Sequence, residues 1–455
     1  MRVAAYHLHS PGSPFDTEVL GFRDVTLELP VITPTFLAEV VGRLEKARER
    51  IGKRRGREIA ETLSAVFLRW RDRADPLRQV AEATLPAVTR FSPSMVVHGL
   101  DLLFHGYQPE AVREQGAGAE KLVDGFESLG PQRSRAYGPA LATHVLAGNI
   151  PGVGLPGIMA ATLLRSASLV KTPSADPLFL ALWAASVAKQ DPEIGDCLAV
   201  VWWRGGEKDL EALAFDRSEV VIAYGSEQTI RDLQGRVRCK FLGHGHRVSF
   251  GVIGRELLLG AEELAERAAY DASLFDQQGC LSPHLFYVEE GGDISPREFT
   301  GVLAAAMERW AARLPPGSTT REEAVAVRKF RARYEAEELA GKEISIFTSP
   351  QGIDWTVIYE ADPTFTPSCL QRTVLVKPVN DLFEIGSLIR VWSPYLQAAG
   401  VAVGPDRLGI IADQLGNAGV NRICPLGRMQ APPLTWHQEG RDLFRDLLRW
   451  VDLEA

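Results

Sequence analysis

The sequence predicts an α/β protein with a largely parallel sheet, divided into at least two domains. From Leu141 onward, short apolar runs alternate with helical segments, and this alternation is typical of βαβ units. A second alternation of the same kind begins near Glu256. The chain has 455 residues, which is too long for one ordinary hydrophobic core, so two or three domains are expected.

The N-terminal region, residues 1–140, is predicted to be mainly helical and to belong to the cofactor-binding half of the protein. Residues 1–30 are expected to be extended, and helical patterns follow over residues 33–73. A further helix is predicted to begin with Ser92 as N-cap and Pro93 as its first residue. Its apolar residues recur at helical spacing: Val96, Val97, Leu100, Leu103 and Phe104.

Residues 141–255 are predicted to form a Rossmann-like nucleotide-binding domain, because strands and helices alternate there at short intervals. The expected strands lie at 143–147, 169–171, 198–203, 220–224 and 237–242, and the expected helices at 156–165, 177–189, 207–213 and 226–233.

Residues 256–430 are predicted to form an α/β catalytic domain, followed by a C-terminal tail at 431–455. A loop at 275–283 separates the first expected helix of this domain from its first expected strand. The expected helices are 261–272, 295–313 and 319–340, and the expected strands are 285–288, 344–348, 355–359 and 373–377.

Composition and charge narrow the class of partner and the compartment. Hydrophobic residues make up 45% and charged residues 24% of the chain, as in ordinary globular proteins. The net charge of −8 argues against nucleic acid or an anionic membrane as the main partner. We find neither a signal-peptide pattern nor an apolar run of the roughly 18–20 residues that a membrane span needs, and we expect a cytoplasmic protein.

The five cysteines are odd in number and widely scattered, and none forms a C-x-x-C pair. Neither a disulfide framework nor a zinc site is therefore indicated, and no ligand cluster for another metal is apparent. Most of the cysteines are expected to be reduced thiols that fill the core.

A glycine-rich turn follows the first predicted strand of the nucleotide-binding region. Gly152, Gly154 and Gly157 match the G-x-G-x-x-G dinucleotide fingerprint, with Asp176 as the candidate ribose ligand. Pro156 inside the motif and the position of Asp176 in a D-P turn argue against this interpretation. A tight strand–helix connection that requires glycine is the plainer alternative.

The same turn resembles that of the aldehyde dehydrogenase superfamily, because Asn149 stands two residues before a proline. In that superfamily the equivalent asparagine donates to an oxyanion. Residues 168–174 resemble the strand that ends in a cofactor-binding lysine, here Lys171. Gly225 and Ser226 resemble the strand-to-helix turn under the cofactor pyrophosphate, and a helix N-terminus also favours an anion on physical grounds.

A second motif surrounds Cys280 in the loop 275–283. An arbitrary cysteine in such a turn is more often a buried structural thiol than a nucleophile. Here the pattern D-Q-x-x-C-x-S-P resembles the bioluminescence-type (LuxC-type) fatty acyl reductases, which form one branch of the aldehyde dehydrogenase superfamily. Residues 419–429, 432–437 and 449–452 resemble the C-terminus of that branch. The resemblance implies an aldehyde-dehydrogenase-like fold with Cys280 as nucleophile.

One departure from the superfamily bears on the reaction. Aldehyde-oxidising members carry a glutamate in an E-L-G-G motif, and this residue activates the water that hydrolyses the acyl-enzyme. If Gly243 matches the first glycine of that motif, the glutamate position holds Phe241. Without that carboxylate the enzyme thioester can await reduction, or exchange its acyl group with a thiol.

Three histidines near these motifs are also candidates. A lone histidine such as His144 is usually a satisfied packing residue. His244 and His246 are two residues apart, and alternate residues of a strand share one face. One of them could protonate the leaving thiolate or the nascent alkoxide.

The resemblance implies NADPH-dependent reduction of a long-chain fatty acyl thioester to the aldehyde. Asn149 and the backbone N–H of Cys280 would hold the oxyanion. Lys171 would lie near the adenosine ribose, and Ser174 stands where NAD-specific members often carry a glutamate, which favours NADPH. The acyl donor would be acyl-CoA or an acylated partner protein of the acyl-protein synthetase kind, and a homo-oligomer is expected.

Three alternatives remain open from the sequence. An oxidising aldehyde dehydrogenase is disfavoured by Phe241 at the glutamate position. A nucleotide-independent acyltransferase or thioesterase would use Cys280 without needing the βαβ region. The third alternative is a non-catalytic acyl-binding subunit, and alkylation of this cysteine without loss of activity would support it.

Overall fold

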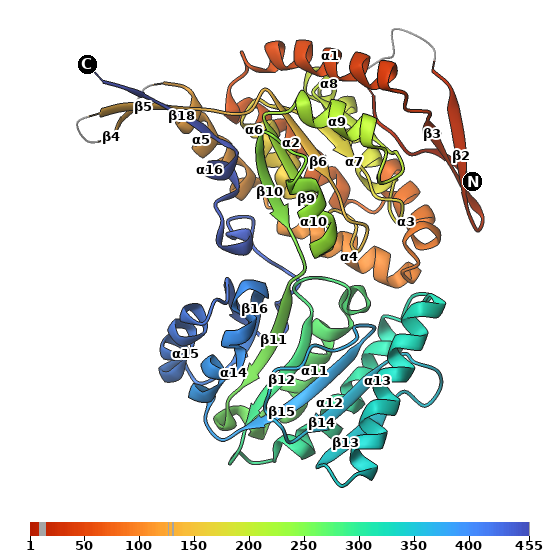
Figure 1. Ribbon diagram of the computed structural model, residues 1–455, viewed down its shortest axis with the longest axis vertical. Coiled ribbons are helices and arrows are strands. Elements are labelled where there is room, and N and C mark those ends of the chain that lie inside the picture. Colours follow the sequence, from red (N-terminus) through yellow and green to blue (C-terminus); the bar gives the residue numbers. More distant parts are fainter. Residues whose placement is uncertain (9–14, 126, 130–131, 455) are drawn as a thin grey trace. The chain divides into compact units, whose positions relative to one another are not determined.

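The structure is a computed structural model that describes residues 1–8, 15–125, 127–129 and 132–454 (Figure 1). The chain folds into two compact units. Unit 1 comprises Met1–Thr89, Leu100–Gly245 and Pro433–Ala455, and unit 2 comprises Arg90–Gly99 and His246–Pro432. The C-terminal segment of the chain therefore belongs to the same unit as most of the N-terminal helices.

Unit 1 is built on a parallel sheet with the strand order β10–β9–β6–β7–β8. The interior strands are buried along their whole length, as expected for apolar strands covered on both faces. The order reverses between β6 and β9, and doubly wound sheets bind ligands at such switch points, beyond the carboxyl ends of the strands. The strands are β6 (Leu141–Val145), β7 (Ala167–Lys171), β8 (Leu198–Val201), β9 (Val220–Tyr224) and β10 (Lys240–His244).

Helices cover both faces of this sheet. One helix, α1, lies against β6, β7 and β8 and packs on α9, whereas α2 packs on α6 and α7. The Ser92 hydroxyl accepts a hydrogen bond from Met95 N at 3.3 Å, which confirms the N-cap predicted for α4. The longer helices of unit 1 are α1 (Pro34–Ile51), α2 (Gly56–Arg71), α3 (Pro76–Thr89), α5 (Pro109–Val123), α6 (Leu155–Leu163), α7 (Phe179–Gln190), α9 (Lys208–Asp216) and α10 (Glu227–Gln234), whereas α4 (Pro93–Gly106) begins in unit 2 and ends in unit 1.

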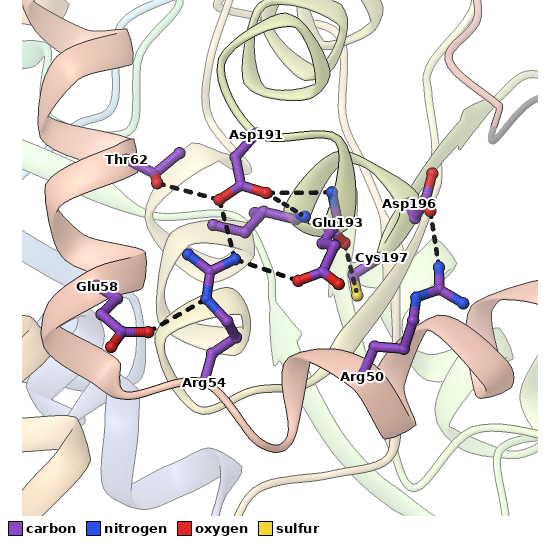
Figure 2. Close-up of polar contacts among 9 residues, drawn as sticks. Arg50, Arg54, Glu58, Thr62, Asp191, Glu193, Asp196 and Cys197 are labelled. Atoms are coloured by element: carbon purple, nitrogen blue, oxygen red, sulfur yellow. Dashed lines mark hydrogen bonds and ion pairs between the residues drawn. The ribbon is translucent and has the colours of Figure 1, made fainter.

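A polar network ties the α1–α2 connection of unit 1 to α8 (Pro192–Asp196) (Figure 2). The Arg54 guanidinium lies 3.0 Å from an oxygen of Asp191, and Asp191 also accepts from Glu193 N at the start of α8. At the far end, the Cys197 thiol donates to the Glu193 carbonyl at 3.5 Å. Burial, above all, raises the pKa of Cys197 to about 12. Cys197 is therefore a structural thiol.

Unit 2 contains a seven-stranded sheet with the order β13–β14–β15–β12–β11–β16–β17. Six of its strands are parallel, and five of them, β15–β12–β11–β16–β17, repeat the third–second–first–fourth–fifth order of unit 1. The sixth is β14, which is parallel to β15, and β13 is an antiparallel edge strand. The strands are β11 (Val248–Ile253), β12 (Pro283–Glu289), β13 (Ile344–Thr348), β14 (Thr356–Glu360), β15 (Thr373–Val379), β16 (Leu396–Ala402) and β17 (Arg422–Pro425).

Two apolar cores lie on the two faces of the unit 2 sheet, and β12 contributes alternately to both. Leu285 and Tyr287 pack with residues of α14 and α15, whereas Phe286 and Val288 pack with α11 and α12. This alternation follows from the two-residue period of a strand. The helices are α11 (Ala261–Ser273), α12 (Pro296–Arg313), α13 (Arg321–Leu339), α14 (Ile385–Ile389) and α15 (Pro405–Asn417).

Two small sheets complete unit 1. One contains β1 (Arg2–Ala4), β3 (Val25–Pro30) and β2 (Thr17–Phe22), and the other β18 (Arg449–Leu453), β5 (Gln132–Tyr137) and β4 (Glu127–Leu129). A short helix, α16 (Leu443–Leu447), precedes β18. Within the described ranges, no helix has both the length and the apolar character required to cross a lipid bilayer.

The predicted α/β class and the alternation of strands with helices are confirmed. Several elements of unit 2 were not predicted, namely β11, β16, β17, α14 and α15. Because β11 belongs to the unit 2 sheet, the larger segment of unit 2 begins at His246, whereas the sequence placed the start of the second domain at residue 256.

Candidate functional site

The candidate cofactor residues of unit 1 gather at the carboxyl edge of its sheet. Lys171 is the last residue of β7 and pairs in register with Val145 of β6 and Val201 of β8. The turn after β6 carries Asn149, and the turn after β9 carries Ser226. Because the strands are parallel, these ends share one edge, beside the switch point between β6 and β9.

The glycine-rich turn after β6 requires glycine for close packing. Gly152 has a φ of +85°, and a Cβ there would meet a methyl of Leu103 at 2.7 Å. Asp176, the candidate ribose ligand of the alternative interpretation, instead caps α7 by accepting from Leu178 N and Phe179 N at 3.2 and 3.0 Å. Burial raises the pKa of Asp176 to about 6. The turn is thus a tight strand–helix connection, with Asn149 half-buried within it.

Lys171 places a buried amine at this edge of the sheet. Its side chain is buried, and burial lowers the pKa of its amine, whereas Glu211 acts in the opposite direction. Glu211 itself is paired with Arg236 at 2.7 Å. In the described part of the chain, no carboxylate lies within ion-pair distance of the Lys171 amine. An anionic ligand group would therefore fit beside it, because it would stabilise the charged amine.

Ser174 lies next to an aromatic side chain that the sequence analysis missed. The indole N–H of Trp202, which follows β8, donates to the Ser174 hydroxyl at 3.2 Å. Ser174 is exposed. The end of β7 is thus linked to the end of β8, and an indole lies beside the predicted adenosine position.

The turn after β9 forms the start of α10. The Ser226 hydroxyl accepts from Thr229 N at 3.2 Å and so caps the helix, and the N–H of Gly225 donates to the His244 carbonyl at 3.1 Å. Positive partial charge at a helix N-terminus favours an anion such as a phosphate. Gly225 and Ser226 are consequently placed where an anionic ligand at the switch point would meet them.

The three candidate histidines have different environments. His144 is fully buried, its Nε2 lies 3.2 Å from the Ser168 hydroxyl, and burial lowers its pKa to about 3. His244 is buried at the end of β10, and its Nδ1 lies 3.0 Å from Glu439 Oε1. His246 is exposed and lies beyond the strand. The shared strand face expected for His244 and His246 does not form, because β10 ends at His244.

In unit 2, Cys280 lies in the turn that enters β12. The turn is held on both sides: Ser249 at the start of β11 donates to the Cys280 carbonyl at 2.8 Å, and Ser282 N donates to the Gly279 carbonyl at 3.0 Å. The Ser282 hydroxyl also accepts from the Gln430 amide at 2.7 Å. The cysteine is half-buried, so that its turn is fixed while the residue keeps partial solvent access.

Two strained backbone stretches support this turn. Phe275–Gln277 and Leu370–Arg372 are each three consecutive non-glycine residues with φ between 50° and 66°. Left-handed backbone costs about 1–2 kcal/mol per residue for L-amino acids, so tertiary contacts must hold both stretches in place.

Side chains from the two stretches bind each other. The Arg372 guanidinium lies 2.7 Å from Asp276, and both side chains are almost completely buried. Gln277 is fully buried, accepts from Thr373 N and donates to the carbonyls of Thr373 and Pro283. The turn before Cys280 is therefore braced against the loop that enters β15.

Cys280 and Cys424 both lie within electrostatic range of the Arg422 guanidinium. Burial lowers the pKa of the neighbouring Arg422, whereas Cys424, Asp271 and Cys280 raise it, so Arg422 lies within electrostatic range of Cys280. A nearby cation favours the thiolate form of a cysteine. Burial, in contrast, raises the pKa of Cys424 to about 11 and also raises that of Cys369.

Arg422 is positioned by the loop 427–431 of the C-terminal motif. Its guanidinium donates to the carbonyls of Met429 and Arg428 at 2.6 and 2.9 Å. Asp271 accepts from the N–H groups of Gly427 and Met429, and burial raises its pKa to about 7. The same loop supplies Gln430, which donates to Ser282 in the Cys280 turn. The loop therefore helps to hold the turn that carries the candidate nucleophile.

Each unit thus presents one part of the expected chemistry. Unit 1 has an edge suited to an anionic cofactor, together with Asn149 and His244, and unit 2 has a braced thiol near a guanidinium. Among the residues that the structure describes, no group of three or more metal-ligating side chains is placed to hold an ion.

Comparisons with known proteins agree with this picture. Residues 53–450 match the family model described as acyl-CoA reductase (LuxC). The long-chain acyl-protein thioester reductase of Aliivibrio fischeri is 26% identical over 317 residues, covering 68% of this chain and 63% of that protein, which is less than two thirds of its length. The corresponding protein of Photobacterium phosphoreum is 23% identical over 75% of this chain and 68% of its own.

Solved structures confirm the aldehyde-dehydrogenase-like fold expected from the sequence. Aldehyde dehydrogenase 21 of Physcomitrella patens is 12% identical, with a TM-score of 0.76 over 98% of this chain and 97% of its own. The NADP-dependent glyceraldehyde-3-phosphate dehydrogenase of Bacillus halodurans C-125 is also 12% identical, with a TM-score of 0.74 over 99% of each chain.

Proposed function

Because the chain belongs to the acyl-CoA reductase (LuxC) family, we propose that it reduces a long-chain fatty acyl thioester to the fatty aldehyde through an acyl-enzyme on Cys280. The observation that carries this proposal is the environment of that thiol. Cys280 lies in a braced, half-buried turn within electrostatic range of Arg422, whereas burial raises the pKa of Cys197, Cys369 and Cys424.

The carboxyl edge of unit 1 is the proposed NADPH site. The Lys171 amine would pair with a cofactor phosphate near the adenosine, and Ser174 would donate to it, since a hydroxyl that accepts from Trp202 can still donate. Gly225 and Ser226 would meet the pyrophosphate at the start of α10. When bound, NADPH supplies the hydride that reduces the acyl carbon.

In the proposed reaction the residues of this chain prepare the acyl group for reduction. The Cys280 thiolate attacks the thioester carbonyl, and the CoA or carrier thiolate leaves. The Asn149 amide and the backbone N–H of Cys280 donate to the oxyanion. Phe241 occupies the proposed position of the water-activating glutamate, so the acyl-enzyme is protected from hydrolysis until it is reduced.

The proposed acyl donor is fatty acyl-CoA or an acylated partner protein of the acyl-protein synthetase kind. The names of the relatives, acyl-protein thioester reductases, support a protein-bound donor, and the family description supports acyl-CoA. We also propose that the protein acts in the cytoplasm as a homo-oligomer.

The decisive test is incubation of the purified protein with tetradecanoyl-CoA and NADPH, with measurement of NADPH consumption and trapping of the aldehyde. We expect one tetradecanal for each NADPH consumed. Release of free tetradecanoate without NADPH consumption would instead identify a thioesterase. Oxidation of tetradecanal with NADP⁺ in the absence of CoA, without the reductive reaction, would identify an oxidising aldehyde dehydrogenase.

A further inference from the structure

We propose that Trp202 commits the Ser174 hydroxyl to act as a hydrogen-bond donor, and that Trp202 thereby helps unit 1 to select a cofactor that carries a 2′-phosphate. This inference rests on the proposed NADPH site and adds to it a positioning residue that belongs to none of the motifs from which that site was argued. Trp202 and Ser174 both belong to unit 1.

The hydrogen bond between the two side chains has only one possible direction. The indole nitrogen of Trp202 lies 3.2 Å from Ser174 Oγ. An indole N–H can only donate, so Ser174 Oγ must accept, and the hydrogen of its hydroxyl must point elsewhere. Because Ser174 is exposed, this hydrogen is available to a group of a bound ligand.

A hydroxyl that is committed to donate distinguishes a phosphate from another hydroxyl. An ionised phosphate oxygen can only accept hydrogen bonds, and a hydrogen bond to an ionised acceptor is roughly twice as strong as one between neutral groups. A ribose 2′-hydroxyl can donate as well as accept, so it gains less from a fixed donor. The Trp202–Ser174 pair therefore favours the 2′-phosphate that distinguishes NADPH from NADH.

The backbone that carries Ser174 is held in place. A Cβ at Gly148 would lie 2.6 Å from Ala175 Cβ and 3.2 Å from Pro173 Cβ, so the glycine-rich turn after β6 packs closely on this segment. The N–H of Asp176 donates to the Pro173 carbonyl at 3.3 Å, which closes a turn around Ser174. A hydroxyl on a fixed backbone loses less conformational freedom on binding a ligand than one on a mobile loop.

Trp202 also starts from a fixed backbone position, at the end of β8. The preceding residue, Val201, pairs in register with Lys171 of β7, and the Val201 carbonyl accepts from Thr172 N at 2.9 Å. The following residue, Trp203, is almost completely buried. The half-buried indole of Trp202 is therefore held beside the strand end that carries the buried amine.

The charges around this position are compatible with an added phosphate. Burial lowers the pKa of the Lys171 amine, and Glu211 acts in the opposite direction. Glu211 pairs with Arg236 at 2.7 Å, and the Asp176 carboxylate accepts from two N–H groups at the start of α7. Both carboxylates are thus partly compensated, whereas a phosphate would stabilise the charged form of Lys171. A 2′-phosphate would therefore meet a cation and a committed donor at one edge of the sheet.

The test measures nucleotide binding to the full-length protein by titration calorimetry. The probes are adenosine 2′,5′-bisphosphate and adenosine 5′-monophosphate, which differ only in the 2′-phosphate. We expect the wild type to bind the bisphosphate at least about tenfold more tightly. Trp202→Phe removes the indole N–H but keeps an aromatic ring, so affinity for the bisphosphate should fall about three- to tenfold, while affinity for the monophosphate stays within about twofold.

Two further variants show whether Trp202 acts through Ser174. Ser174→Ala should weaken binding of the bisphosphate by about tenfold or more. The double variant should bind no more weakly than Ser174→Ala, because without the hydroxyl the indole has nothing to position. The matched control is Trp450→Phe, which makes the same change at an exposed indole of β18 in unit 1 and should leave both affinities unchanged.

The monophosphate distinguishes positioning from a merely structural role, because a damaged site would lose affinity for both probes. Equal losses for the two probes in Trp202→Phe would overturn the inference, and so would wild-type affinities in this variant. Additive losses in the double variant would also overturn it, since Trp202 would then act independently of Ser174. A wild-type protein that binds neither probe nor NADPH would instead overturn the proposed function.

Discussion

The two units contain parallel sheets with the same strand order, yet their candidate residues lie at opposite edges of those sheets. In unit 1, Lys171, Asn149, Ser226 and His244 end strands or follow them. In unit 2, Cys280 precedes β12, its turn is held from the starts of β11 and β15, and Arg422 at the start of β17 lies within electrostatic range of it. One fold pattern is thus used in two chemically different ways.

The helix dipole explains the difference. The carboxyl edge of a parallel sheet faces helix N-termini, whose positive partial charge suits an anionic cofactor. A glycine turn and a capped helix are therefore enough to bind an anion there. The amino edge faces helix C-termini, and α11 ends at Ser273, shortly before the Cys280 turn. Positive charge for a thiolate must therefore come from a side chain at that edge, and Arg422 lies within electrostatic range of Cys280.

The largest expected effect concerns the thiol itself. Cys280→Ala should abolish both acylation and aldehyde formation, because Cys280 keeps partial solvent access in its turn, whereas Cys197 and Cys424 are buried and burial raises the pKa of each of these thiols. Mass spectrometry after incubation with acyl-CoA in the absence of NADPH measures the adduct. Cys197→Ala, Cys239→Ala and Cys424→Ala are the controls and should acylate normally. An adduct on Cys239, or active enzyme without any adduct, would contradict the assignment.

The buried Arg372–Asp276 ion pair, at the amino edge of the unit 2 sheet, should contribute more to the free energy of unfolding than the Ser226 helix cap at the carboxyl edge of the unit 1 sheet. Arg372→Met leaves the Asp276 carboxylate buried without its partner, and we expect the free energy of unfolding to fall by about 3–5 kcal/mol. Ser226→Ala removes only a helix cap, worth about 0.5–2 kcal/mol. Denaturant unfolding of both variants measures the difference.

A double variant checks the origin of that loss. Asp276→Asn combined with Arg372→Met removes both charges and should be more stable than Arg372→Met alone, since the cost arises from an unpaired buried charge. Equal stability of the single and double variants would show that Arg372 acts through packing, and that the two edges differ less than their charges suggest.

At the carboxyl edge, Asn149→Ala tests whether unit 1 takes part in the chemistry as well as in binding. We expect turnover to fall about 10²–10³-fold, equivalent to about 3–4 kcal/mol, as for the loss of one oxyanion donor. The dissociation constant for NADPH, measured by fluorescence, should change little, because Lys171 and Ser226 remain. Nearly full turnover would mean that Asn149 serves only the turn.

The sequence predicted the fold of unit 1 better than that of unit 2, and the reason is residue chemistry. The strands of unit 1 are apolar and bounded by clear turns, as in Val220–Tyr224. In unit 2, β16 contains glutamine, three alanines and a glycine, which have weak strand preferences. It is a strand because it lies between β11 and β17, a tertiary effect that no local pattern reports.

The candidate site was predictable where one local motif carries it and unpredictable where side chains meet across the sequence. Cys280 and Asn149 stand in recognisable turns, although their proposed roles still await the experiments above. The left-handed backbone before Cys280 contains no glycine, so no local sequence pattern predicted it. Likewise, neither Trp202 beside Ser174 nor Glu439 beside His244 has a sequence signal, because each contact joins segments that only folding brings together.

The smallest expected effect is a change of cofactor preference at Ser174. The wild-type protein should prefer NADPH, because Lys171 and the hydroxyl can both contact a 2′-phosphate. Ser174→Glu would place a carboxylate within a few ångströms of that phosphate, where repulsion of about 1–4 kcal/mol is expected. Such an energy corresponds to about tenfold or greater discrimination, so the ratio of kcat/KM values should shift towards NADH.

Ser174→Gln is the matched control, because glutamine has nearly the size of glutamate but no charge. Ser174 is exposed, and both replacements can accept the Trp202 indole hydrogen, so neither should disturb the fold. If charge repulsion changes the cofactor preference, Ser174→Gln should still prefer NADPH, and only Ser174→Glu should lose that preference. If both variants lose it equally, the hydroxyl contact selects the cofactor. Equal kcat/KM values for both cofactors in the wild type, unchanged by Ser174→Glu, would place recognition elsewhere on the carboxyl edge, because a charge added beside a bound phosphate cannot be without effect.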